Sequence, residues 1–215
     1  MIVLAIDTAG VDCAAAVYDT DACTLLASVS ETIGRGHAER LMAMIDEALD
    51  AAGLEMDAIG RIGVTVGPGS FTGIRVGVAA ARGLALALGV ECVGVNTLAV
   101  LAHAAPPSDE TVLAAINAHR DEVYVQAFRQ GQPSDEPALV TLEDYLVLAK
   151  APGLITVGSA ASLLVDPEAE TSPDHYPIAI VAQLAAEAKA QGKAKPLYLR
   201  GPDAKPQTGF AVARA

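Results

Sequence analysis

The chain has 215 residues, of which 52% are hydrophobic, and its 14 basic and 26 acidic residues give a net charge of −12. This length is enough for one or two domains that fold without disulfides or a structural metal. Phosphate backbones are bound by clustered Lys and Arg, and unpaired bases stack on exposed aromatic rings. The acidic balance and an aromatic content of 4% therefore argue against tight nucleic-acid binding by this chain alone.

Cysteine usage and the N-terminus indicate a reducing setting. Cys13, Cys23 and Cys92 are scattered and form no Cys-x-x-Cys pair, so neither a disulfide framework nor a zinc motif is predicted. Residues 1–7 lack the basic region and long apolar core of a signal peptide. The most apolar stretch, residues 76–101, contains two charged residues and an asparagine, so no membrane span is predicted. We expect a cytoplasmic protein.

The first part of the chain predicts three short strands joined by tight turns, which is typical of an antiparallel meander. They are residues 1–6, 13–18 and 24–32. An amphipathic helix follows over residues 37–52, where apolar residues recur every three or four positions before Gly53.

The next segments alternate between strand and helix. A strand over 61–66, a helix over 72–88, a strand over 91–95 and a helix over 96–104 are predicted, with Ser70 or Thr72 as N-cap of the first of these helices. The second half repeats the pattern in shortened form. Its predicted elements are strands over 112–116, 122–127 and 154–157 and helices over 141–149 and 177–191. Pro106-Pro107-Ser108 marks the predicted boundary between residues 1–105 and 106–215.

Two features allow a nucleotide-binding interpretation beside a structural one. The run Gly67–Gly73 joins a strand to a helix, where a loop can cradle phosphate. It lacks the Gly-Lys-Ser/Thr ending of a Walker loop and the spacing of a dinucleotide fingerprint, so a tight structural turn is favoured. Asp7 ends the first strand and could face a nucleotide-bound Mg²⁺, although such an Asp is more often a turn former.

The helix predicted over 72–88 is apolar on more sides than one sheet can cover, and small residues keep its other sides thin. Either a second layer of the same chain or a partner's helix must cover the rest. The four histidines show no metal-binding spacing, and no Ser-His-Asp set can be assigned.

Several segments resemble the TsaB (YeaZ) family. The most specific is Val66–Ala79, and the resemblance is dense from residue 1 to about residue 128. The supporting segments are residues 4–8, 37–41, 85–89, 93–96, 121–124 and Pro196-Leu197-Tyr198-Leu199-Arg200. Ala9-Gly10 departs from the Ser-Thr common in the family at this strand end, which weakens the case for a nucleotide at Asp7.

The resemblance implies an α/β, actin-like fold with two lobes, of which the C-terminal lobe is reduced. It also implies a non-catalytic subunit of the complex that makes threonylcarbamoyladenosine next to the tRNA anticodon. Such a subunit pairs with catalytic TsaD and helps recruit the ATPase TsaE. This chain alone would hold no cofactor and contact tRNA only indirectly, while the complex uses ATP and a metal held by TsaD.

The paralogue TsaD carries Asn-His-x-x-x-His, with two histidines on one helical face as a metal requires. The matching segment here begins at Asn96, and Thr97 and Leu101 stand at the two histidine positions. Leu101 cannot bind a metal and His103 does not restore the spacing. This chain is therefore predicted not to be the catalyst. An actin-like ATPase or phosphotransferase and a metallopeptidase-like enzyme are the alternatives.

We expect the helices over 37–52 and 72–88 to pack against the same two helices of TsaD, or of a second copy of this chain. On this prediction Ile45→Glu or Val78→Glu abolishes pairing. The predicted centre of this interface is Leu41, Met44, Ile45, Ile74, Val78, Ala81 and Ala85, with His37, Arg40 and Arg82 near the rim.

Overall fold

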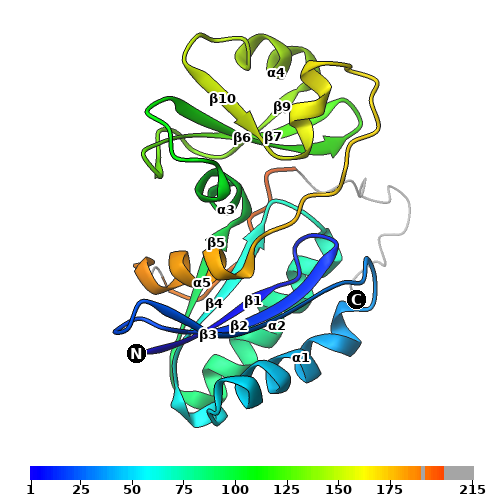
Figure 1. The fold of residues 1–215 in the computed structure, drawn as a ribbon. Helices are drawn as coiled ribbons and strands as arrows, with labels where there is room; N and C mark the ends of the chain where they lie inside the picture. Colours follow the sequence, from blue (N-terminus) through cyan, green and yellow to red (C-terminus); the bar gives the residue numbers. More distant parts are fainter. Residues whose placement is uncertain (190–191, 201–215) are drawn as a thin grey trace, which may run out of the picture.

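The computed structural model describes residues 1–189 and 192–200, which fold into two lobes that each contain one sheet (Figure 1). The first sheet has the order β3-β2-β1-β4-β5. Its strands are β1 (Ile2–Asp7), β2 (Asp12–Asp19), β3 (Thr24–Thr32), β4 (Ile59–Gly67) and β5 (Glu91–Asn96). β1, β2 and β3 form the predicted antiparallel meander, and β4 and β5 run parallel to β1.

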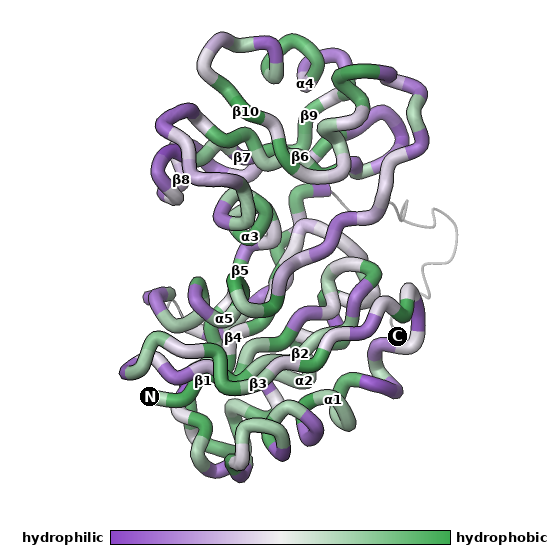
Figure 2. The backbone as a smooth tube through the Cα atoms, viewed as in Figure 1, coloured by the Kyte–Doolittle hydropathy of each residue, from purple (hydrophilic) through white to green (hydrophobic). Residues whose placement is uncertain are grey.

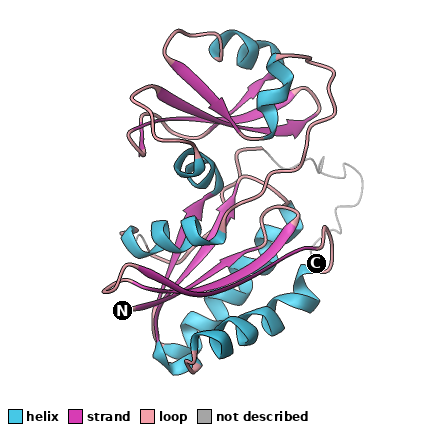
Figure 3. Ribbon diagram, viewed as in Figure 1, coloured by secondary structure: helices cyan, strands magenta, loops and turns pink. Residues whose placement is uncertain are grey.

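Helices cover both faces of this sheet. α1 (His37–Ala52) and α2 (Phe71–Leu88) lie on one face, and α5 (Ile178–Glu187) lies on the other (Figure 3). β1 and β2 are therefore buried along nearly their whole length, without the alternation of a sheet that has one wet face. Gly63 permits the contact with α5, because a Cβ there would lie 2.2 Å from the Cβ of Ala185.

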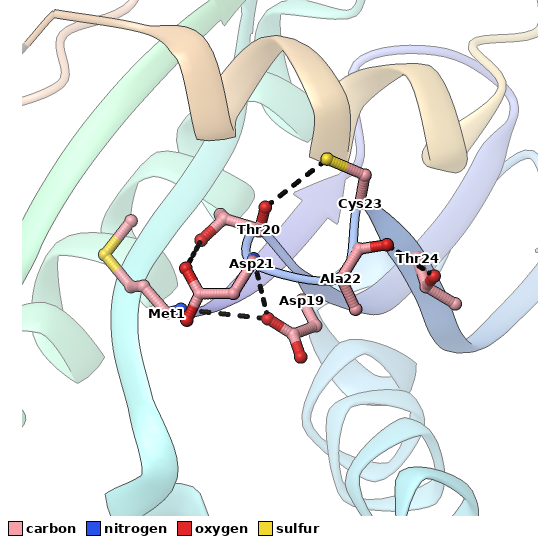
Figure 4. Close-up of polar contacts among 7 residues, drawn as sticks. All are labelled: Met1, Asp19, Thr20, Asp21, Ala22, Cys23 and Thr24. Atoms are coloured by element: carbon pink, nitrogen blue, oxygen red, sulfur yellow. Dashed lines mark hydrogen bonds and ion pairs between the residues drawn. The ribbon is translucent and has the colours of Figure 1, made fainter.

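The hairpin between β2 and β3 is held by local polar contacts (Figure 4). The α-amino group of Met1 donates to Asp21 at 2.7 Å, and the Sγ of Cys23 donates to the carbonyl of Thr20 at 3.5 Å. Cys23 has a φ of 50°, in the left-handed region of the turn. These contacts fix the hairpin at the rim of the first lobe.

The second lobe is smaller, and its sheet has the order β10-β6-β7-β8 with β9 also paired to β7. Its strands are β6 (Thr111–His119), β7 (Glu122–Arg129), β8 (Gln132–Pro133), β9 (Ala138–Thr141) and β10 (Leu154–Val157). The helices α4 (Leu142–Leu148) and η2 (Ser159–Leu164) cover one face with a separate apolar core around Tyr145. α3 (Thr97–Ala104) lies between the lobes and packs on β6 and β7.

The hydrophobic segments run along the inner strands of both sheets, and the loops are hydrophilic (Figure 2). α3 and the facing residues of the second sheet belong to the same apolar core as the first lobe. The lobes are therefore joined by packing as well as by the chain.

Two sequence expectations need adjustment. The helix expected over residues 177–191 ends at Glu187, and Gln191 lies outside the described residues. Although residues 106–215 were assigned to the second lobe, α5 packs on β1, β2 and β4 of the first. The sequence indicated a helix here but not which of the two sheets it covers. The short helix η1 (Met56–Ala58), β8, β9 and η2 were not predicted.

α2 is the one helix among the described residues that is long and apolar enough to cross a membrane by length and composition alone. Its inner face packs against β4, and two arginines lie on its outer side. The core helix of a globular domain passes the same test.

Candidate functional site

The glycine-rich loop between β4 and α2 (residues 67–73) packs directly on the loop that follows β1. The hydroxyl of Thr8 donates to the carbonyl of Gly73 at 2.7 Å, and the N–H of Ser70 donates to the carbonyl of Ala9 at 2.7 Å. A Cβ at Gly73 would lie 2.0 Å from the carbonyl oxygen of Thr8. This close approach explains why residue 73 is a glycine, and it favours a tight structural turn over a phosphate-binding loop.

Asp7 lies fully buried at the end of β1. Its Oδ1 accepts from the hydroxyl of Thr65 at 2.6 Å and from the N–H of Ala9 at 3.0 Å, while Oδ2 has no partner among the described residues. Burial raises the pKa of Asp7 to about 6, because desolvation outweighs these two hydrogen bonds. The carboxyl group can thus hold a proton near neutral pH.

The space above the loop after β1 is filled by residues 174–176. A Cβ at Gly10 would lie 2.8 Å from the carbonyl oxygen of Asp174 and 3.1 Å from the ring of Tyr176. Tyr176 is buried, and burial raises its pKa well above the usual value. An α/β fold can hold a ligand in the crevice at the end of such a strand. Here residues 174–176 fill the crevice on the side of Gly10.

The two positions that correspond to the histidine pair of TsaD hold Thr97 and Leu101, and both side chains are buried. Thr97 is fully buried and donates from Oγ1 to the carbonyl of Pro68 at 2.6 Å. Leu101 is buried against the backbone near Gly158. Over residues 1–189 and 192–200, no three His, Cys, Asp or Glu side chains lie close enough to hold a metal ion together.

The predicted centre of the partner interface is wrong, because the chain itself covers it. All seven predicted apolar residues are at most 5% exposed and belong to the main core. They face the sheet, because the most apolar stripe of each helix is the one that packs on β-strands. The residues concerned are Leu41, Met44, Ile45, Ile74, Val78, Ala81 and Ala85.

Of the three predicted rim residues, only Arg82 is exposed. His37 is buried, with Nε2 lying 3.1 Å from the carbonyl oxygen of Asp12. Arg40 is half-buried and forms ion pairs with Glu31 and Glu47. The pair with Glu31 ties α1 to β3, and the pair with Glu47 lies within α1.

The exposed outer face of α1 and α2 contains small and apolar residues that the sequence reasoning missed. Leu86 is 83% exposed and Met42 is 44% exposed. Ala79, Gly83 and Ala87 are exposed at a spacing of four, so they share one side of α2. A Cβ at Gly83 would meet no atom within 4 Å in the part of the chain that the structure describes. That spacing was the signal in the sequence that could have identified this face.

Comparison with known proteins identifies the family. The family profile for tRNA N6-adenosine threonylcarbamoyltransferase (TsaD) matches residues 28–161. The structure of YeaZ from Pseudomonas aeruginosa superposes with a TM-score of 0.77 at 30% identity, covering 92% of this chain and 99% of that one. The chain belongs to the TsaB/YeaZ family.

The TsaB/YeaZ relatives cover different shares of the chain. The TsaB protein of Escherichia coli K12 is 34% identical over 134 residues, which are 61% of this chain and 57% of that protein. The match therefore spans little more than half of that relative. An uncharacterized protein of Mycobacterium tuberculosis H37Rv is 34% identical over 209 residues, covering 95% of this chain and 94% of its own length. The superposition on YeaZ confirms the predicted two-lobed α/β fold.

Proposed function

We propose that this chain is a non-catalytic subunit of the machinery that makes tRNA threonylcarbamoyladenosine, and that it pairs with a TsaD-type protein. The observation that carries the proposal is the exposed outer face of α1 and α2. A helix face of small and apolar residues allows a second pair of helices to approach closely. The printed names of the TsaB relatives and the match to the TsaD family support the same pathway and partner.

The pairing surface is the outer side of α2 with the neighbouring side of α1, and not the inner side that the sequence suggested. Leu86 and Met42 supply exposed apolar anchors, and Ala79 and Gly83 are exposed small residues that leave room on α2. A stable interface buries roughly 800 Å² on each side, an area that two helices of 16 and 18 residues can supply. The same surface would form a homodimer when TsaD is absent.

The division of labour follows from what the described residues offer. Thr97 and Leu101 occupy the two metal-ligand positions, so the metal and ATP would be held by TsaD. The acidic charge supports tRNA binding by the partners and not by this chain. The ATPase TsaE would join the pair, and the complex would work in the cytoplasm.

Co-purification of this chain with the TsaD homologue of its organism tests the proposal. Gly83→Arg adds a long side chain to open space, so we expect a folded protein that no longer pairs. Ala151→Arg, at an exposed position of the second lobe, is the matched control and should pair normally. Light scattering after gel filtration reports pairing, and circular dichroism reports folding.

One result would reject the pairing surface, and another would reject the non-catalytic role. One is a folded Gly83→Arg protein that binds TsaD with wild-type affinity. The other is tRNA modification by the isolated chain, which would assign catalysis here.

The alternative ATPase function rests on Asp7, whose Oδ2 has no partner among the residues that the structure describes. The packing of Tyr176 and Asp174 over Gly10 fills the space next to it. Weak or undetectable binding in a calorimetric titration with Mg²⁺ and ATP is therefore expected, and low-micromolar binding would favour the alternative.

A further inference from the structure

The chain passes from the first lobe to the second after α3 and returns before α5, and its last described residues then run back towards the second lobe (Figure 1). Two lobes joined in this way are expected to move relative to each other unless further contacts hold them. The segment Pro196–Arg200 has no regular secondary structure. Its hydrogen bonds nevertheless reach both lobes.

The contacts of Leu197 and Tyr198 are with the first lobe. The N–H of Leu197 donates to the carbonyl of Val66, the next-to-last residue of β4, at 2.8 Å. The Nε of Arg75 on α2 donates to the hydroxyl of Tyr198 at 2.8 Å, and its guanidinium lies 3.5 Å above the ring of Phe71. The segment is thus attached to both β4 and α2.

Arg200 makes the contacts with the second lobe. Its Nη2 donates to the carbonyls of Ala118 and His119 at 2.9 and 3.3 Å and forms an ion pair with Glu122. These acceptors belong to the turn between β6 and β7. One guanidinium therefore holds both sides of the hairpin.

The turn that Arg200 holds has an unusual backbone. His119, Arg120 and Asp121 have φ values of 57°, 58° and 57°, in the left-handed region that favours glycine. Such conformations persist where the surroundings hold them in place. The two carbonyls on Arg200 and the N–H of Leu142, which donates to the carbonyl of Asp121 at 2.7 Å, provide that support.

We propose that Leu197–Arg200 is a brace that holds the two lobes at a fixed angle. Four residues span the distance from the end of β4 to the β6–β7 turn, and each end is hydrogen-bonded to the backbone of a different lobe. α3 joins the lobes by apolar packing, and the brace adds a second, polar tie. The lobes then move as one body. The brace does not depend on the proposed pairing with TsaD.

The test measures the distance between the lobes in the full chain by pulsed electron paramagnetic resonance. Cys23 is exposed on the first lobe and accepts one spin label, Glu143→Cys on α4 accepts the other, and Cys92→Ser removes the half-buried thiol. In this background Arg200→Ala should broaden the distance distribution. Arg129→Ala, at an exposed arginine of β7 in the second lobe, should leave it unchanged.

Hydrogen exchange separates a brace from a local support of the turn. Arg200→Ala should make the amides of residues 119–122 exchange about tenfold faster, since the carbonyls of Ala118 and His119 lose the donor that holds the turn. If exchange rises while the distance distribution stays as in the wild type, Arg200 only supports the turn and the brace is refuted. No change in either measurement refutes it as well.

A second pair of variants covers the case in which Arg200→Ala does not fold. Arg200→Lys keeps the charge but has a shorter side chain without the planar fork of the guanidinium, so it should broaden the distribution less than the alanine variant. Tyr198→Phe removes only the hydroxyl that accepts from Arg75 and should loosen the first-lobe end. A distribution of wild-type width in both variants contradicts the proposal.

Discussion

In the first lobe, helices cover both faces of the sheet, whereas in the second lobe α4 and η2 cover one face and the other turns towards α3. β1 and β2 are consequently buried without interruption, while β7 alternates between buried and half-buried residues. The fully covered sheet of the first lobe thus supports the exposed outer sides of α1 and α2. The sheet of the second lobe depends on α3 to cover its other face. Candidate partner contacts therefore belong on the outer side of α1 and α2.

The largest effect should come from a charge on the inner face of α1. Ile45 is fully buried, so Ile45→Glu should lower the free energy of unfolding by about 4 kcal/mol or more and should not leave a folded, unpaired protein. Met42→Glu, on the exposed side of the same helix, should change it by less than about 0.5 kcal/mol. Denaturant unfolding followed by circular dichroism measures both. An Ile45→Glu protein with the wild-type midpoint would show that this face is not packed.

Asp7 should make the first lobe sensitive to pH. Its folded-state pKa of about 6 lies above the unfolded value of 3.8, so the folded state binds the proton more tightly. The contribution of Asp7 is therefore fully present at low pH and is lost as the pH rises from about 4 to about 6, by up to about 3 kcal/mol. Asp7→Asn does not titrate, so its stability relative to the wild type should rise over this range. A constant difference between pH 4 and 7 would argue against a raised pKa.

The contact between β4 and α5 tests how tightly the α5 side of the first sheet is packed, compared with the side that α1 and α2 cover. Gly63→Ala places a methyl group 2.2 Å from the Cβ of Ala185 and should cost about 2 kcal/mol. Gly83→Ala, in open space on α2, should instead stabilise the protein by about 0.5–1 kcal/mol. Thermal unfolding of the two variants measures this contrast. Equal midpoints would mean that α5 moves aside freely.

The smallest expected effect lies in the second lobe. Tyr145 donates from its hydroxyl to the carbonyl of Ala160 at 2.8 Å, so Tyr145→Phe should cost about 1 kcal/mol and loosen η2. Hydrogen exchange of residues 159–164 checks this, with the first-lobe amides as an internal control. Faster exchange throughout both lobes would indicate that the two cores unfold as one unit.

The local elements were largely predictable because their signals are local. Apolar periodicity located α1 and α2. Ser70, one of the two N-cap residues expected from the sequence, caps α2. Gly53 and Gly89 end the two helices in left-handed conformations. The short strands β8 and β9 carry too few residues for a period to show. The candidate interface was only half predictable, since the sequence identified the two helices but assigned their partner surface to the wrong side.

The sequence by itself determined the longer helices and strands, the family resemblance carried by residues 66–79, and the absence of histidine at positions 97 and 101. Tertiary structure decided which face of each helix is free, the return of α5 to the first sheet, and the link from Arg200 to the β6–β7 turn. Periodicity shows that a helix has an apolar side but carries no information on what covers it. Contacts between residues 80 or 120 positions apart depend on how the whole chain closes, because they arise only when both lobes are in place.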